Sequence, residues 1–445
     1  MNSQTPLYAA LAAYAAQQPT RFHIPGHKGR PLTLPQGASF PDTALDLTEL
    51  PPTGNLYVGG DAIAQAEALW ASAWGMPHCQ FLTGGSTQGL HAAFFAACRP
   101  GDRVLIDRAC HKAVYTALAL VDARPHYLLR NMETPISPSD VENFFATHPK
   151  VKTFCMVSPT YYGVLSDIPA IAAAVHAHGG TLVVDAAHGA HLPFLGENPF
   201  LGADLVVTSA HKTLPALGQG ALLFSGGKFS PEDLRRAAAV TGTSSPSYLV
   251  LASLDLARGH MMEQGRGDYE KTIAQVQKLR DFFPSLRGKN LDPARFTLLC
   301  DDGFALQEAL YAQNIYPEMA DKRHVVFVCT ESDKPKDFTA LAKALQDQSP
   351  PLSDPSRQTP DRGARPTPPP KVPAPVVTRT PRAGLFAPKE RVPLPAAVGR
   401  ISAQILAPYP PGVPVLAPGE LISKKHLAYL TEIGYNIEDR IEVVL

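Results

Sequence analysis

Three features that mark other classes of protein are missing from this chain of 445 residues. Its 40 Lys and Arg residues balance its 40 Asp and Glu residues, so no excess charge points to a nucleic-acid or an anionic membrane partner. No uninterrupted run of about 18 apolar residues is present, so we expect no membrane-spanning helix. The N-terminus lacks the basic-then-apolar order of a secretory signal, and we therefore expect a cytoplasmic protein.

The chain also lacks paired cysteines. Its six cysteines are scattered and form no Cys-x-x-Cys motif, at Cys79, Cys98, Cys110, Cys155, Cys300 and Cys329. This spacing indicates reduced, mostly buried thiols and excludes a disulfide framework or a cysteine-based zinc site.

Proline is abundant but unevenly distributed, and this distribution indicates the domain organisation. Of the 44 prolines, 19 fall between Pro350 and Pro418. A stretch this rich in proline is typical of an extended linker or loop, which contributes little to a core. We predict an N-terminal arm over 1–60, a large domain over 61–290, and a smaller α+β C-terminal domain over 291–445 interrupted by a linker at about 349–380.

Short apolar runs typical of buried strands alternate with helical patterns through the middle of the chain. The clearest strand patterns lie at 103–107, 151–157, 181–185 and 204–208. Helical patterns lie at 7–17, 62–74, 113–121, 168–178 and 247–281. This alternation predicts an α/β fold with a mostly parallel sheet covered on both faces. Ligands of such sheets bind at the carboxyl ends of the strands.

A lysine follows one of these predicted strands. The apolar run that ends at Thr208 continues into Ser209, His211 and Lys212. Lysine is seldom buried, because desolvating its ammonium group is costly unless the group is paired or deprotonated. At a strand end of an α/β enzyme, a lysine with a lowered pKa can form a Schiff base. A surface lysine at a strand end is the alternative, and this segment alone leaves it open.

Other polar residues are predicted at the same edge of the sheet. Asp185 ends the preceding strand, where a carboxylate either holds a protonated ring nitrogen or caps a turn. Gly85, Ser86 and Thr87 precede a helical run, where free N–H groups favour a phosphate, although a simple helix cap has the same pattern. The pattern is neither a Walker A loop nor Gly-x-Gly-x-x-Gly, which argues against ATP and NAD.

Three further residues fit the same ligand. Ser209 and His211 flank the lysine and could donate hydrogen bonds to the same phosphate. His111 follows the strand over 103–107, where it either stacks on an aromatic ring or belongs to a partly exposed loop.

A metal site is a competing interpretation of the histidines near Asp185. The candidate ligands are His176, His178, Asp185, His188 and His191. His176 and His178 are two residues apart on a predicted helix and point in different directions. Both also precede the strand that Asp185 ends. We therefore expect no metal.

The motifs together resemble the Orn/Lys/Arg decarboxylase family, in its short form, among the pyridoxal-phosphate enzymes of fold type I. The resemblance follows the family's order over nearly the whole chain, through the motifs at 22–29, 46–49, 84–87, 111–112, 158–163, 185–191, 209–212, 244–248 and 408–420. One departure is the run Gly218-Gln219-Gly220 after the lysine. A receiver-like N-terminal domain is also missing, so the large ring-shaped assemblies of some relatives are not expected.

The resemblance implies a role for each matching residue. Lys212 would bind pyridoxal 5′-phosphate as a Schiff base, Asp185 would pair with the ring nitrogen, and His111 and Ala187 would pack on the two ring faces. The remaining cofactor contacts would come from Gly85, Ser86, Thr87, Thr160, His188, Ser209 and His211. Glu318 is the candidate for binding the distal cation of the substrate.

The implied reaction is decarboxylation of arginine, lysine or ornithine to agmatine or a diamine, which would feed polyamine metabolism. The alternatives are another fold type I reaction, such as transamination or aldol cleavage, and a non-catalytic regulator with the same fold. By analogy we expect a homodimer, or a multiple of it, with shared active sites. The sequence leaves the choice among the three amino acids open.

Overall fold

The computed structural model describes residues 4–21, 25, 27–30, 43–348, 372–408 and 413–445. Three sequence features fall wholly or partly outside these residues. They are half of the motif over 22–29, most of the proline-rich linker over 349–380, and residues 409–412 of the motif over 408–420.

The described chain divides into two compact units, and each is built from several segments. The first contains 1–97, 168–176 and 181–270. The second contains 98–167, 177–180 and 271–445. These units do not follow a linear division at residues 60 and 290, so the three-part division stays a prediction.

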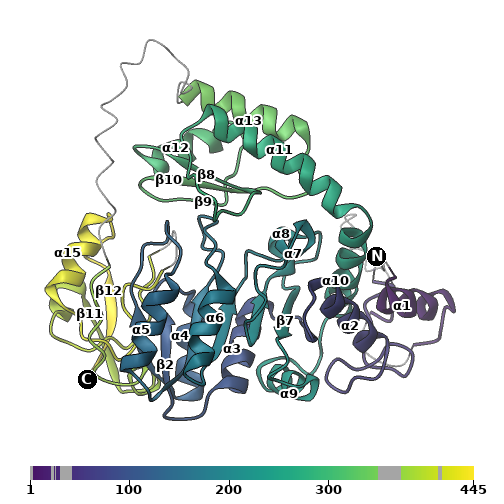
Figure 1. Ribbon diagram of the computed structural model, residues 1–445, viewed down its shortest axis with the longest axis horizontal. Coiled ribbons are helices and arrows are strands. Elements are labelled where there is room, and N and C mark those ends of the chain that lie inside the picture. The colour runs from purple at the N-terminus through teal and green to yellow at the C-terminus, as the bar shows by residue number, and fades with distance from the viewer. Residues whose placement is uncertain (1–3, 22–24, 26, 31–42, 349–371, 409–412) are drawn as a thin grey trace. The chain divides into compact units, whose positions relative to one another are not determined.

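The first unit contains four strands flanked by helices (Figure 1). Its strands are β1 (His78–Leu82), β5 (Thr181–Asp185), β6 (Leu205–Thr208) and β7 (Ala221–Ser225). Its helical elements are α1 (Pro6–Ala16), α2 (Ala62–Trp74), α3 (Gly85–Ala97), α6 (Ile168–Ala177), α7 (Leu192–Leu195), α8 (Ala210–Thr213), α9 (Pro231–Thr241), α10 (Tyr248–His260) and the π-helical turn η1 (Met261–Gly265). The strands lie in the order β1-β7-β6-β5, with β5 parallel to β6. Strand β7 is antiparallel to β6 and to β1.

Complete burial explains why the strands of the first unit read as continuous apolar runs. Every residue of β5, β6 and β7 is buried, as expected for strands covered on both faces. The Trp74 ring stacks on Phe224 of β7 with ring centroids 4.1 Å apart, and on Phe200 at 5.6 Å. Aromatic burial of this kind makes α2 an integral part of the core.

The N-terminal helix α1 is attached to α10 through a buried carboxylate. Asp255 Oδ2 accepts hydrogen bonds from the backbone N–H groups of Leu7 at 2.9 Å and Tyr8 at 3.1 Å. Arg258 of α10 also donates to the carbonyl of Gln4. Because the first N–H groups of a helix have no partner inside it, Asp255 replaces the missing cap. The start of the predicted N-terminal arm is therefore fixed to the first unit.

The second unit contains three groups of strands. Its strands are β2 (Arg103–Asp107), β3 (Arg124–Leu128), β4 (Val151–Val157), β8 (Arg295–Leu299), β9 (Met319–Ala320), β10 (His324–Val328), β11 (Lys389–Pro393) and β12 (Arg440–Val444). Its helical elements are α4 (Lys112–Val121), α5 (Pro138–Thr147), most of α11 (Arg266–Phe282), α12 (Gly303–Tyr311), α13 (Pro335–Gln348), α14 (Pro381–Leu385), the 3₁₀ turn η2 (Leu394–Ala397) and α15 (Lys424–Glu432). Strands β4-β2-β3 pair in parallel, whereas β8-β10-β9 and β11-β12 are antiparallel.

The antiparallel sheet β8-β10-β9 has its own apolar core. Helices α11, α12 and α13 lie on this sheet in Figure 1, and their apolar residues join those of the strands in one buried cluster. Phe296 of β8 and Phe327 of β10 stack at the centre of this cluster, with ring centroids 5.6 Å apart. Strands β8 and β10 pair directly in this sheet, which fits the small α+β domain predicted for this part of the chain.

The segment that ends at Glu420 is anchored by a buried ion pair. Arg108 binds Glu420 through two nitrogens, at 2.6 and 2.9 Å, and also donates to the carbonyl oxygen of Val415 at 2.8 Å. The guanidinium lies over the rings of Tyr127 and Tyr115. A bidentate pair of guanidinium and carboxylate requires a defined geometry. It therefore attaches the segment around Glu420 to the residues that follow β2.

Several predicted elements differ in detail from the structure. The helix predicted over 247–281 is interrupted by the π-helical turn η1, which separates α10 from α11. Helix α3 begins at Gly85, so the predicted phosphate cup forms its first turn and not the loop before it. The α/β class is confirmed, although β7 runs antiparallel to both of its neighbours, β1 and β6. No helix in the described part of the chain has the length and hydropathy needed to cross a membrane.

Candidate functional site

The candidate site lies in the first unit, where β5 and β6 end side by side. Asp185 is the last residue of β5 and pairs in register with Val207 of β6. The backbone N–H of Ala186 donates to Val207 O at 2.7 Å, and the Thr208 hydroxyl donates to Ala186 O at 2.8 Å. These bonds hold together the two segments that follow β5 and β6. The residues of both segments therefore lie at the same edge of the sheet.

Asp185 is buried at this edge, with 2% of its surface exposed. Its Oδ1 accepts a hydrogen bond from the N–H of Ala187 at 3.1 Å. A buried carboxylate strongly favours a cationic partner, because an unpaired charge in this environment is costly. The role of Asp185 toward a protonated ring nitrogen stays a prediction, and Ala187, itself buried, lies directly beside it.

Lys212 lies on the short helix α8, which follows β6 after Ser209. Its Nζ is 3.1 Å from Nε2 of His188, a buried residue of the chain after β5. Lys212 is half-buried. This burial argues against the alternative of an ordinary surface lysine at a strand end. At this distance a proton can pass between the amine and the imidazole, so the amine has an acceptor that favours its nucleophilic form.

The first turn of α3 offers hydrogen-bond donors for an anion. The backbone N–H groups of Ser86 and Thr87 have no acceptor in the described part of the chain. The Ser209 hydroxyl is completely buried and also lacks a partner among the described residues. Buried polar groups are rarely left unpaired, so a hydroxyl of this kind fits a ligand that supplies the acceptor. A phosphate at the start of α3 would do so.

Two backbone carbonyls connect this turn to the lysine helix. The Gly85 N–H donates to Gln219 O at 2.9 Å. His211 donates to Gly220 O through its backbone N–H at 3.3 Å and through Nδ1 at 2.8 Å. Gln219 has a positive φ of 74°, which few residues other than glycine adopt. We did not predict a role for Gln219 from the sequence, although the departure Gly218-Gln219-Gly220 was the signal for it.

Three predicted site residues belong to the second unit. His111 caps α4, where its Nδ1 accepts from the Ala113 N–H at 3.2 Å, and its side chain is exposed. Thr160 is completely buried, and its hydroxyl donates to Met132 O at 3.0 Å, so this hydroxyl supports its own loop. Glu318 is exposed and accepts a hydrogen bond from the Tyr161 hydroxyl at 2.7 Å. The roles of all three toward a ligand stay predictions.

The histidines that suggested a metal have other partners. His176 Nε2 lies 2.9 Å from Asp204 Oδ2, and His178 Nε2 lies 2.8 Å from Glu142 Oε1. His191 stacks on the ring of Tyr269, with ring centroids 5.0 Å apart. In the described ranges, no group of three or more His, Cys, Asp or Glu side chains is arranged to hold a metal ion.

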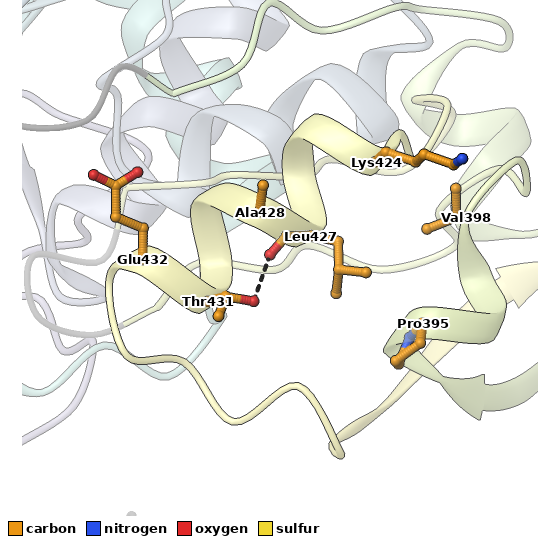
Figure 2. A pocket seen from close by; sticks show the side chains of 7 residues that line it. All are labelled: Pro395, Val398, Lys424, Leu427, Ala428, Thr431 and Glu432. Carbon is orange, nitrogen blue, oxygen red and sulfur yellow. Dashed lines mark hydrogen bonds between the residues drawn. The ribbon is translucent and has the colours of Figure 1, made fainter.

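An open groove lies between α15 and the segment around η2 (Figure 2). It is lined by Pro395, Val398, Lys424, Leu427, Ala428, Thr431 and Glu432. The two charged side chains lie toward opposite ends of α15. None of the predicted site residues lines this groove, so it has no part in the predicted chemistry.

A buried aspartate at the end of β5, a lysine just after β6 and the predicted phosphate site at the start of α3 are the arrangement expected of a pyridoxal-phosphate enzyme of fold type I. The same fold occurs in lysine decarboxylase A from Pseudomonas aeruginosa, with a TM-score of 0.81 at 20% identity over 100% of this chain and 81% of that chain. The chain belongs to the Orn/Lys/Arg decarboxylase family. The model of the family's major domain matches residues 5–301, and that of its C-terminal domain matches residues 382–437.

Two relatives resemble the chain over nearly its whole length. Arginine decarboxylase of Bacillus subtilis (strain 168) is 30% identical over 96% of this chain and 93% of its own length. Arginine decarboxylase of Bacillus anthracis is 30% identical over 96% of this chain and 92% of its own length. The protein is thus a pyridoxal-phosphate-dependent decarboxylase, and the predicted family, enzyme class and cofactor are confirmed.

Loss of the Ser209 hydroxyl should weaken cofactor binding without destabilising the fold. A hydrogen bond to a charged group contributes about 1.5–3 kcal/mol, so Ser209→Ala should raise the Kd for pyridoxal phosphate roughly tenfold or more. Titration of the apoprotein with cofactor measures this change. The control is Ser225→Ala at the other end of the sheet, where the hydroxyl donates to Phe229 O at 2.8 Å. That variant should lose thermal stability and keep its cofactor affinity; equal cofactor affinity in both variants would exclude Ser209 from the phosphate site.

Proposed function

We propose that the protein decarboxylates arginine to agmatine and CO₂. The coarser assignment, a decarboxylase of basic amino acids, follows from family membership. The Bacillus relatives named as arginine decarboxylases support arginine over lysine and ornithine. The observation that carries the proposal is the strand-end arrangement, in which buried Asp185 and half-buried Lys212 face one edge of the sheet.

Each site residue of the first unit would have a separate role toward the cofactor. Pyridoxal phosphate, when bound, supplies an electron sink for the electrons left behind when CO₂ departs. Lys212 would hold the cofactor covalently, and Asp185 would keep a proton on its ring nitrogen. Ser86, Thr87 and Ser209 would hold the phosphate. These contacts fix the cofactor at three separate points, so its orientation toward the substrate is defined before the reaction begins.

Proton return to the substrate's α-carbon also needs a donor. Lys212 is our candidate, because its amine is 3.1 Å from His188 Nε2 and can be reprotonated by that imidazole. Glu318 stays our candidate for binding the guanidinium of arginine, since a carboxylate is a strong acceptor for a planar fork of N–H donors.

Three further assignments remain predictions from the family. They are a homodimer with shared active sites, a cytoplasmic location, and a place for agmatine in polyamine metabolism. We also propose that the His27 segment reaches the active site of a neighbouring subunit. Its described part shows His27 Nε2 at 3.1 Å from Asp46 Oδ2, within the first unit.

A side-by-side assay of the three amino acids tests the proposed function. With purified holoenzyme, CO₂ release from arginine should exceed release from lysine and ornithine, with agmatine formed in equal amount. The measurement is trapped CO₂ together with chromatography of the amine product. Accumulation of the pyridoxamine form of the cofactor without CO₂ would instead indicate transamination, and release from lysine alone would contradict the choice of arginine.

A further inference from the structure

A tight turn over residues 217–220 lies between α8 and β7 in the first unit. The Gly220 N–H donates to Leu217 O at 3.0 Å, which closes the turn. Its third residue, Gln219, has a φ of 74°, and type II turns require a positive φ at this position. Glycine usually occupies such a position because it has no Cβ, whereas this chain has a glutamine there.

The turn presents two successive carbonyl oxygens to two different segments of the unit. Gln219 O accepts the N–H of Gly85, the first residue of α3, at 2.9 Å. Gly220 O accepts from His211 of α8, from the backbone N–H at 3.3 Å and from Nδ1 at 2.8 Å. The direction of the Gln219 carbonyl follows from the backbone dihedral angles at Gln219. A different conformation of this residue would therefore remove the bond to Gly85.

The side chain of Gln219 has no part in these contacts. It is exposed and makes no hydrogen bond to another residue in the described ranges. The turn is supported from α10, where the Ser253 hydroxyl accepts from the Leu217 N–H at 3.1 Å. A Cβ at Gly220 would lie 3.1 Å from Leu254 Cδ2, so the turn also packs closely on this helix. The backbone of Gln219 thus has a structural task that its side chain does not share.

The start of α3 and the Ser209 hydroxyl lie on the same face of the sheet. A Cβ at Gly89 of α3 would lie 2.5 Å from Val207 Cγ1, so α3 packs closely on the face to which Val207 of β6 points. Ser209 follows two residues later in an extended conformation, and side chains two apart in an extended chain point to the same face. The N–H groups of Ser86 and Thr87 and the Ser209 hydroxyl therefore lie on one side of the sheet, at its carboxyl end.

We propose that Gln219 is a positioning residue, whose backbone holds the first turn of α3 so that its N–H groups and the Ser209 hydroxyl bind the cofactor phosphate together. The inference rests on the proposed phosphate contacts and does not depend on which amino acid is decarboxylated. An anion site built from two segments binds best when both are ordered before the ligand arrives. The bond to Gly85 provides this order, because Gly85 directly precedes Ser86 and Thr87.

Substitutions at Gln219 separate the backbone conformation from the side chain. Gln219→Val introduces a β-branched residue, for which a positive φ is strongly unfavourable, and Gln219→Ala has a smaller penalty. Gln219→Gly and Gln219→Asn tolerate this φ but remove or shorten the side chain. The matched control is Gln18→Val, because Gln18 is also exposed and has a φ of 44°, but lies after α1.

Titration of each apoprotein with pyridoxal phosphate, and with pyridoxal, which lacks the phosphate, measures the effect. Gln219→Val should raise the Kd for pyridoxal phosphate about tenfold, because binding has to restore the strained turn. The Kd for pyridoxal should change by less than about twofold. The glycine and asparagine variants should keep the wild-type Kd for both ligands within about twofold. Gln18→Val should lower the melting temperature and leave both Kd values unchanged.

Three results would overturn the inference. The first is equal weakening of both ligands in Gln219→Val, which would assign the turn to general support. The second is an unchanged Kd for pyridoxal phosphate in that variant. The third is an equal loss in Gln219→Gly, because the side chain would then matter. If Gln219→Val does not fold, as its melting curve would show, Gln219→Ala should show the same selectivity for the phosphate with a loss of about threefold.

Ser209→Ala in the same titration distinguishes this inference from the proposed phosphate site. If Ser209→Ala weakens pyridoxal phosphate and Gln219→Val does not, the phosphate site stands and the role of Gln219 is wrong. If Ser209→Ala keeps the full affinity, the phosphate site is wrong and the inference fails with it. Both Kd values are measured without an amino acid, so the choice of arginine as substrate cannot affect them.

Discussion

Lys212→Ala should abolish turnover, with a loss of at least about a thousandfold, because no other group at the edge of the sheet can replace the covalent anchor. Borohydride reduction of the wild-type holoenzyme should attach the cofactor to the peptide that contains Lys212. Mass spectrometry of the digested protein locates this adduct. In the variant, the adduct should be missing from that peptide.

Two matched variants make this result specific. Lys212→Arg keeps the positive charge but cannot form a Schiff base, because the guanidinium stays protonated, so it should be as inactive as the alanine variant. Lys228→Ala removes a lysine of the same unit whose Nζ donates to the Thr181 hydroxyl at 2.8 Å. It should keep near-wild-type turnover and the adduct on Lys212. An adduct on another lysine would show that Lys212 has been misassigned.

Asp185→Asn should retain the cofactor and lose about a hundredfold or more in turnover. The amide is nearly the same size as the carboxylate and can still accept from Ala187 N–H, so the fold and the phosphate contacts should survive. What is lost is the buried negative charge that would keep a proton on the ring nitrogen, and an unprotonated ring is a weaker electron sink. Turnover with arginine, measured at full cofactor occupancy, checks the prediction.

The control for this variant is a second buried aspartate at the opposite end of the same strands. Asp204 precedes β6 and accepts from Leu182 N–H at 2.7 Å and from His176. Asp204→Asn should lower the melting temperature and leave turnover per folded enzyme unchanged. If both variants lose turnover equally, or if Asp185→Asn is as active as wild type, the role of Asp185 in keeping the ring nitrogen protonated is wrong.

Local pattern was enough to predict several elements closely. Helix α2 begins and ends at the predicted residues, since Asp61 caps its first turn and Gly75 ends it with a φ of 61°. The strands β2 and β5 also have the predicted bounds, because their apolar runs are flanked by polar or turn residues. Each of these signals depends on neighbours within a few positions, which the sequence displays directly.

Longer helices were predicted less well. The pattern over 247–281 remained helical throughout, whereas the structure contains a π-helical turn at Met261–Gly265. Nothing in the local pattern marks this turn, because an extra residue in a helical turn depends on packing around it. The start of α3 was placed too late for a related reason: Gly85 is a weak helix former, but its N–H is satisfied by Gln219 O from a distant segment.

The sequence by itself determined the α/β class, the family, and the residues at the ends of β5 and β6, because apolar runs mark buried strands and the polar residues that end them are adjacent in sequence. The tertiary structure decided which groups meet. It placed His188 beside Lys212, linked Gly85 and His211 through Gln219 and Gly220, and joined Tyr161 to Glu318 across 157 positions of sequence. These contacts could not be predicted from the sequence. Hydrogen bonds between distant segments depend on side-chain direction and loop geometry, which local sequence patterns do not determine.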